Sequence, residues 1–143
     1  MIKLNAYVNF QGNTEEAFRF YQSVFGGEFL GNITRFKDVE GLPGRENLSE
    51  AELNGIMHVC LPIGNDYLMG TDALEAMGHK LNMGNNFSIS VHPDSREEAD
   101  RIFAGLSAGG QITMPMTDMF WGDYWGSLTD KFGLQWMVNY HKK

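Results

Sequence analysis

The sequence has few cysteines, few basic residues and no long hydrophobic run, and each shortage excludes a class of protein. Its single cysteine, Cys60, cannot form a disulfide within the chain and fits a reducing compartment. Eleven Lys and Arg residues against 18 Asp and Glu residues give a net charge of −7. Nucleic acids and anionic membranes both bind basic faces, so this balance argues against both as partners. No apolar run approaches the roughly 20 residues that span a bilayer.

Several local motifs are also missing. The first ten residues have neither a basic n-region nor a continuous apolar h-region, so no signal peptide is predicted and we expect a cytoplasmic protein. No P-loop, GxGxxG, GxSxG or Cys-x-x-Cys motif occurs, which excludes phosphate-cradle, serine-hydrolase and zinc-finger interpretations. What remains is a 143-residue chain, 43% hydrophobic and 20% charged, which suits one soluble domain with a sizeable core.

Hydrophobic periodicity predicts one order of elements twice. Residues 3–10 and 86–92 alternate between apolar and polar side chains, as strands with one buried face do. Each is followed by a predicted helix with acidic residues in its first turn and a Gly-Gly pair at its end. The expected caps are Asn13 or Thr14 for the first helix and Asp94 or Ser95 for the second. The expected buried stripes are Ala17, Phe20, Tyr21 and Val24, then Ala99, Ile102, Phe103 and Leu106.

Further strands are predicted at residues 28–36, 56–63, 67–71, 111–116 and 134–140. Residues 37–52 are acidic and contain two glycines and a proline, so we expect a loop with one short helical turn at Ser49–Leu53. A loop of this length is often a lid or a partner-binding arm, and it is otherwise simply mobile. Residues 73–84 are expected to link two halves of the chain.

The two predicted helices share a motif. Glu-Glu-Ala-x-Arg-Phe-Tyr at residues 15–21 recurs as Glu-Glu-Ala-x-Arg-Ile-Phe at residues 97–103, an offset of 82 (97 − 15). We interpret this as the internal duplication of a βαβββ module of roughly 70 residues. The alternative is chance similarity between two capped helices.

Residues 120–140 hold all three tryptophans and two of the five tyrosines. Aromatic side chains bury large areas, so this segment is expected to anchor the core. Its Asp130–Gly133 stretch is predicted to turn before the last strand. Asp72 and Asp130 are both expected to stabilise turns rather than to perform chemistry.

The doubled βαβββ pattern resembles the vicinal oxygen chelate superfamily, which includes glyoxalase I, extradiol dioxygenases and bleomycin-resistance proteins. Within it the chain resembles the PhnB-like branch, whose members often carry a demethylubiquinone methyltransferase name. The matching segments are FQGNTEEAFRFYQSVFGGE (10–28), IMHVCLPIGNDYLMGTD (56–72), EEADRIFAGLSAGGQITMPM (97–116) and FWGDYWGSLTDKFGLQWMV (120–138).

This resemblance implies a fold of the α+β class. One domain would contain two modules, at about residues 1–78 and 84–143, forming a curled mixed sheet around a cavity. It also implies a homodimer. The chain has no glycine-rich motif for S-adenosylmethionine, so we do not infer methyl transfer.

Enzymes of the superfamily bind a divalent metal through His, Glu or Gln side chains on the first and last strands of each module. The matching positions here are Asn5, Ala6, Tyr7, Tyr67, Leu68, Met69, Phe87, Ser88, Trp136 and Met137. Amides and hydroxyls are weak ligands and apolar side chains are none, so we predict neither a family-type metal nor another cofactor. The histidines at positions 58, 79, 92 and 141 show no ligand spacing of their own.

Strand alternation divides the side chains into two sets. The more apolar faces, predicted to pack under the helices, are Leu4/Ala6/Val8, Met57/Val59/Leu61, Phe87/Ile89/Val91 and Leu134/Trp136/Val138. The opposite, mostly polar set is Asn5, Tyr7, Asn9, His58, Cys60, Ser88, Ser90, Gln135, Met137 and Asn139. We expect this set to line a ligand pocket, with Trp121 at its mouth or in a dimer contact. The alternative is the solvated face of a sheet.

Three functions stay open at this stage. The first is binding of a neutral or weakly polar small molecule without metal, which the uncharged lining favours. The second is catalysis of a lyase, isomerase or dioxygenase type, with His58 as the acid–base candidate or with a metal on other ligands. A lone strand histidine is also commonly a structural donor. The third is sequestration of a cationic drug by the acidic residues Asp38, Glu40 and Glu46.

Overall fold

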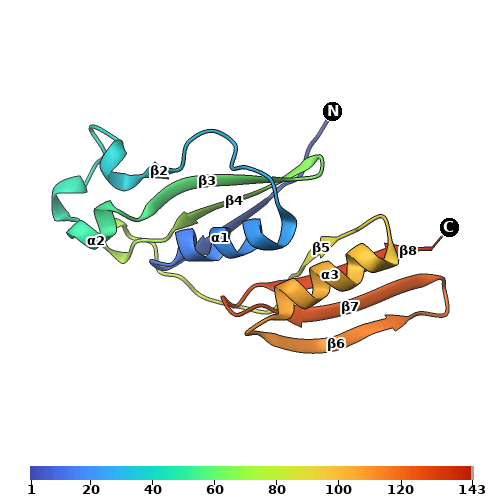
Figure 1. Ribbon diagram of the computed structural model, residues 1–143. Helices are drawn as coiled ribbons and strands as arrows, with labels where there is room; N and C mark the ends of the chain where they lie inside the picture. The colour runs from blue at the N-terminus through green and yellow to red at the C-terminus, as the bar shows by residue number, and fades with distance from the viewer. Residues whose placement is uncertain (143) are drawn as a thin grey trace. The chain divides into compact units, whose positions relative to one another are not determined.

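The computed structural model describes residues 1–142, and the chain divides into two compact units, Met1–Asn82 and Met83–Lys143 (Figure 1). Each unit contains a four-stranded mixed sheet and one helix of 12 residues, in the order strand, helix and three strands. The predicted α+β class and the duplicated βαβββ order are therefore confirmed. The shared cavity between the two modules stays a prediction. No helix among residues 1–142 combines the length and apolar character needed to cross a membrane.

The sheet of the first unit has the strand order β1-β4-β3-β2. β1 runs parallel to β4, while β4 with β3 and β3 with β2 are antiparallel. The helix α1 (Thr14–Phe25) follows β1 and lies against β3 and β4. The strands are β1 (Ala6–Phe10), β2 (Thr34–Arg35), β3 (Ile56–Ile63) and β4 (Asp66–Asp72).

The sheet of the second unit repeats this plan with the order β5-β8-β7-β6. β5 is parallel to β8 and the other pairs are antiparallel. The helix α3 (Arg96–Ser107) lies against β6, β7 and β8, and Ser95 caps it by accepting a hydrogen bond from the Glu98 N–H at 3.1 Å. The strands are β5 (Ile89–Val91), β6 (Gln111–Asp118), β7 (Asp123–Thr129) and β8 (Gln135–His141).

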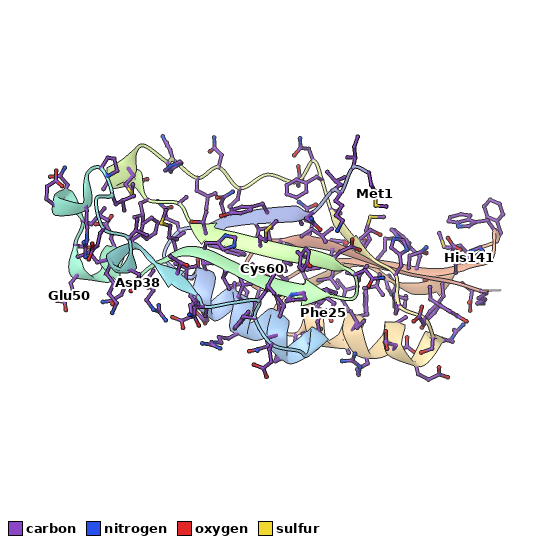
Figure 2. All side chains as sticks on the ribbon, turned by 90° about the horizontal axis from the view of Figure 1, so that it is seen from above. Met1, Phe25, Asp38, Glu50, Cys60 and His141 are labelled. Atoms are coloured by element: carbon purple, nitrogen blue, oxygen red, sulfur yellow. The ribbon has the colours of Figure 1, made fainter. Side chains whose placement is uncertain are left out.

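The segment between β2 and β3 is folded. It contains two short 3-10 helices, Phe36–Asp38 and Arg45–Asn47, and the helix α2 (Glu50–Leu53); a third 3-10 turn, Glu75–Met77, follows β4. Ser49 caps α2 reciprocally with Glu52, which confirms the predicted helical turn. A small hydrophobic cluster forms beneath, made of Phe36, Leu48 and Leu74 with Leu42, Leu53, Met57 and Met77. The segment thus has its own core. Figure 2 shows Asp38 and Glu50 in this part of the first unit.

Burial follows the predicted alternation in the strand centres. Val8 and Phe10 of β1 and Trp136 and Val138 of β8 are buried, while their sequence neighbours are more exposed. β1 and β5 start later than predicted, however, at Ala6 and Ile89. As a result Leu4 and Phe87, which were assigned to the packed faces, lie before the strands and are 92% and 61% exposed.

Three other expectations were wrong. In α1 Ala17, Tyr21 and Val24 are buried as predicted, but the buried phenylalanine is Phe18 and not Phe20. The predicted strand 28–36 shrinks to two residues, because Gly31 takes a positive φ of 68° and interrupts the extended chain. The first helix has no side-chain cap from Asn13; the N–H and hydroxyl of Thr14 instead donate to Asp72 at 3.1 and 2.5 Å.

Candidate functional site

The first unit has an open sheet face on the side away from α1. Register places the predicted lining residues there: Tyr7 pairs with Met69, Met69 pairs with Cys60, and Thr34 pairs with His58. Because side chains alternate along a strand, Asn5 and Asn9 project on the same side as Tyr7. The apolar residues of β1 and β3 project on the opposite side, toward the core.

Two ring side chains meet across this face. The Tyr7 hydroxyl lies 3.4 Å from His58 Nδ1, and their ring centroids are 6.0 Å apart. The two strands that carry them are separated by β4, so the side chains approach each other over the middle strand. Partial burial raises the pKa of Tyr7, so its hydroxyl stays protonated near neutral pH and can donate to Nδ1. The ring proton of a neutral His58 is then on Nε2.

The remaining predicted residues of this face have separate roles. Asn5 Oδ1 accepts a hydrogen bond from the Tyr67 N–H at 3.1 Å. Cys60 lies on β3 (Figure 2) and is only 5% exposed. Burial raises the pKa of the Cys60 thiol, so it stays uncharged. Asn9 is exposed and available to a ligand.

A buried carboxylate positions the strands beneath the face. Asp72, 4% exposed, accepts hydrogen bonds at Oδ1 from the Gly12 N–H and from both donors of Thr14, and at Oδ2 from the Ile56 N–H. It therefore connects the start of α1 and the start of β3 to the end of β4. Asp72 was expected to stabilise a turn, and it instead joins segments that are far apart in the sequence. Every buried side-chain nitrogen and oxygen in the described chain has a hydrogen-bond partner.

The second unit has a corresponding open face on the side away from α3. Ser90 pairs with Met137, and Met137 pairs with Ser127, whose hydroxyl lies 2.7 Å from that of Thr113. Ser90 Oγ lies 3.1 Å from His92 Nε2. Gln135, at the start of β8, donates to the Gly84 carbonyl at 3.0 Å, and Ser88 is exposed just before β5.

A cluster at one end of this face was not predicted. Asp123 accepts hydrogen bonds from Trp121 Nε1 at 3.0 Å, from Asn139 Nδ2 at 3.2 Å and from His141 Nδ1. Trp121 and Asn139 were expected to contact a ligand, but Asp123 and His141 were not expected to take part. The cluster was missed because no strand was predicted at residues 123–129. These residues alternate, and pairing them with residues 135–141 across the predicted turn places Asp123 opposite His141.

The donors on these faces do not fit the metal of the superfamily's enzymes. The first and last strands of the two modules, β1, β4, β5 and β8, present amides, hydroxyls and thioethers at the relevant positions, and these bind divalent ions weakly. Across residues 1–142, no three His, Cys, Asp or Glu side chains are grouped so that they could hold a metal ion. We therefore derive no chemistry through a metal.

Sequence comparison relates residues 2–139 to a family model described as 3-demethylubiquinone-9 3-methyltransferase. Protein YjdN of Escherichia coli K12 is 30% identical over 147 residues, which cover 98% of this chain and 96% of that protein. Both matches extend over nearly the whole chain.

Solved structures give the same result. The crystal structure of protein PA1353 from Pseudomonas aeruginosa is 31% identical, with a TM-score of 0.85 and full coverage of both chains. A putative 3-demethylubiquinone-9 3-methyltransferase, PhnB protein, from Bacillus cereus is 26% identical, with a TM-score of 0.74 and coverage of 97% and 99%. A glyoxalase/bleomycin resistance protein/dioxygenase family enzyme from Burkholderia phytofirmans shares the fold at 19% identity, with a TM-score of 0.65 and coverage of 96% and 98%. This chain therefore belongs to the family described as 3-demethylubiquinone-9 3-methyltransferase, is similar to a PhnB protein, and shares the fold of a glyoxalase/bleomycin resistance/dioxygenase family enzyme.

Proposed function

We propose that this chain binds a small, neutral or weakly polar organic molecule on its open sheet faces, without the divalent metal of related enzymes. The observation that carries the proposal is the pairing of Tyr7 with His58 at 3.4 Å on the face away from α1. The two side chains come from different strands, and Tyr7 is 48% exposed. A ligand can therefore reach a hydrogen-bonding pair that the sheet holds in place.

The chemistry of the face supports an uncharged ligand. Asn5, Tyr7, Asn9 and Cys60 carry no charge near neutral pH, and His58 is the one titratable base among these predicted lining residues. A charged ligand would lose hydration without gaining an opposite charge here. A neutral molecule with one donor and one acceptor can bind the Tyr7 and Asn9 side chains while its apolar part contacts Met69.

Binding is a simpler inference than methyl transfer. The family description names a methyltransferase, but one fold carries many functions. The chain lacks the glycine-rich turn that approaches a nucleotide in dinucleotide-style sheets. S-adenosylmethionine belongs in the binding experiment below as a direct test of the family description.

The Tyr7–His58 geometry also favours a second candidate, acid–base catalysis. When the Tyr7 hydroxyl donates to Nδ1, the Nε2–H of His58 is directed elsewhere and can donate a proton to a bound molecule. This candidate requires turnover, whereas the first requires binding alone.

The experiment is a fragment screen by two-dimensional amide NMR with neutral polar compounds and S-adenosylmethionine. We expect at least one neutral fragment to shift amides of β1, β3 and β4. For that fragment Tyr7→Phe and His58→Gln should each raise Kd about threefold or more, as the loss of a hydrogen bond does. His79→Gln, at an exposed position outside the sheet, is the matched control. Shifts restricted to α1, or unchanged Kd in both variants, would contradict the proposal.

Metal content is tested separately. Protein purified without chelator should contain less than stoichiometric zinc, nickel, manganese or iron by elemental analysis. A stoichiometric metal would overturn the metal-free part of the proposal and leave the Tyr7–His58 site open to test.

We further propose a cytoplasmic homodimer. The outer strand β6 leaves Ile112 and Met114 about half exposed, and Phe120 beyond it is 97% exposed. Apolar side chains at these levels of exposure are suited to an interface between proteins. Light scattering at micromolar concentration should give twice the 16.1 kDa chain mass, and a single chain mass would contradict the dimer.

A further inference from the structure

We propose a second binding site in the second unit, built around Asp123, for a small planar molecule with a weakly acidic hydroxyl, of the phenol class. The site uses Trp121 as a stacking surface and His141 Nε2 as the hydrogen-bond acceptor. It does not rest on the Tyr7–His58 proposal, because all of its residues lie in the second unit.

One carboxylate, Asp123, orients two exposed rings. Asp123 Oδ2 accepts from Trp121 Nε1 at 3.0 Å and Asn139 Nδ2 at 3.2 Å, while Oδ1 accepts from His141 Nδ1. The Asp123 side chain is only 17% exposed, whereas Trp121 is 53% exposed and the His141 side chain is 71% exposed. Exposed rings normally rotate freely, so fixing them costs side-chain entropy. Because Asp123 holds both rings in place, they form a pre-organised surface that is open to solvent.

The backbone around Asp123 is held as well. The Met119 N–H donates to the Asp123 carbonyl at 2.7 Å, and the Gly122 N–H donates to the Met119 carbonyl at 3.0 Å. Gly122 has a φ of 102°, a conformation that favours glycine and lets the β6–β7 connection turn tightly. The Lys142 N–H donates to the Gly122 carbonyl at 3.3 Å and joins the end of β8 to this turn. Figure 2 shows His141 at that end of the unit.

The protonation of the Asp123 cluster leaves one ring nitrogen able to accept a hydrogen bond. Hydrogen bonding from His141, then from Asn139 and Trp121, lowers the pKa of Asp123, so it is a carboxylate at neutral pH. The His141 proton that Asp123 accepts is on Nδ1, and in the neutral ring Nε2 is then an acceptor. A hydroxyl donor satisfies Nε2, and an aromatic ring beside it can stack on the Trp121 indole.

The surrounding charges favour a neutral ligand over a strong acid. The cations near this end of the sheet, Arg96 and Lys142, both pair with Asp118. Arg96 also lies over the Tyr124 ring at 3.8 Å, on the side of the sheet that carries α3. These cations are therefore engaged on Asp118, and Asp123 itself would repel an anion. A weakly acidic hydroxyl brings a proton to His141 without bringing a full charge.

The test uses phenol, which is un-ionised at neutral pH, with anisole as the matched probe that lacks the hydroxyl proton. We expect phenol to bind saturably, to change tryptophan fluorescence and to shift the ring signals of His141 in carbon–proton NMR. His141→Gln, Trp121→Leu and Asp123→Asn should each raise Kd about fivefold or more, and anisole should bind about fivefold more weakly or not at all.

Two controls keep the outcome clear. His58→Gln and His79→Gln should leave the Kd for phenol unchanged, which separates this site from the first unit's face. Asp123→Asn can weaken folding, so the decisive variants are His141→Gln and Trp121→Leu at exposed positions, checked by melting temperature. Unchanged Kd in both of these, or ring shifts at His58 instead of His141, would overturn the proposal.

Discussion

The two units share one order of elements, but in each unit a different buried carboxylate connects the segments by hydrogen bonds. In the first unit Asp72 accepts from residues 60, 58 and 16 positions away in the sequence. In the second unit Asp130, 3% exposed, accepts from the Phe132 and Leu134 N–H groups and the Trp136 indole, only 2, 4 and 6 positions away. The same fold is therefore held once by long-range bonds and once by a local turn. Long-range contacts need more of the chain to be ordered first, so the first unit depends more on its complete fold.

The segments that follow the helices differ too. The first unit carries the folded 36–53 region with its own hydrophobic cluster, whereas the second unit carries the β6–β7 hairpin, whose connection exposes Phe120 and Trp121. Apolar residues are therefore buried in the 36–53 region of the first unit, whereas apolar residues of the β6–β7 connection in the second unit are exposed to solvent. This difference places the Asp123 cluster in the second unit.

The largest expected effect comes from removing Asp72. Asp72→Ala leaves the Gly12, Thr14 and Ile56 donors without their acceptor, and we expect a loss of about 4 kcal/mol of unfolding free energy. Asp130→Ala should cost less, about 2 kcal/mol, because its donors lie within six residues along the chain and can rearrange locally. Urea unfolding followed by circular dichroism measures both.

Tryptophan fluorescence adds a second probe, since all three tryptophans lie in the second unit. In Asp72→Ala the circular dichroism transition should shift more than the fluorescence transition. Asp66→Ala, at the exposed start of β4, is the control and should change stability by less than about 0.5 kcal/mol. Equal losses of unfolding free energy in Asp72→Ala and Asp130→Ala would show that the long-range and the local hydrogen bonds contribute equally to stability.

A smaller effect is expected where each helix crosses a strand glycine. A Cβ at Gly70 would lie 2.5 Å from Phe18 Cε1, in the fully buried core of the first unit. A Cβ at Gly126 would lie 2.8 Å from Phe103 Cε1 and 2.8 Å from the flexible Met116 Sδ. We expect Gly70→Ala to cost about 3 kcal/mol and Gly126→Ala about half as much.

The companion variant Phe18→Leu tests the cause of the Gly70 effect. In the background of Gly70→Ala it should recover about 1 kcal/mol, because the leucine withdraws the ring atoms from the new methyl group. Strict additivity of the two substitutions in thermal melts would show that the Gly70 penalty has another origin.

The smallest effect concerns acid and the end of β8. Hydrogen bonding from Arg96, and then from Lys142, lowers the pKa of Asp118 from 3.8 to about 2. A lowered carboxylate pKa stabilises the folded form above the ordinary pKa, and this contribution disappears as the pH falls from about 4 through 2. The pair is half exposed, so the effect on global stability is small.

The expected readout is local. Amide exchange at residues 140–142 should quicken between pH 5 and pH 2, after correction for the intrinsic rate of exchange. Asp118→Asn should show the faster exchange already at pH 5, while β1 in the first unit should not respond. Identical protection factors in the variant and the parent chain would contradict this anchoring role.

Local patterns predicted much of the fold because burial repeats with the geometry of each element. Alternation predicted that Val8 and Trp136 are buried, and the acidic starts and Gly-Gly ends predicted both helices. The same patterns were wrong where two phases fit equally well: Phe18 and Phe20 both lie near the apolar side of α1, and only packing against Gly70 selects Phe18. β7 was missed because glycines flank and interrupt its alternation.

The chemistry of the open faces divides in the same way. The sequence by itself determined which side chains of a strand share a face, since a strand alternates at every residue whatever its partners are. Only the tertiary structure decided which of them meet. Tyr7 reaches His58 from 51 positions away, and Asp123 reaches His141 from 18, because strand order and register place them side by side. Strand register depends on the packing of whole strands against one another, so it cannot be predicted from a short segment of sequence.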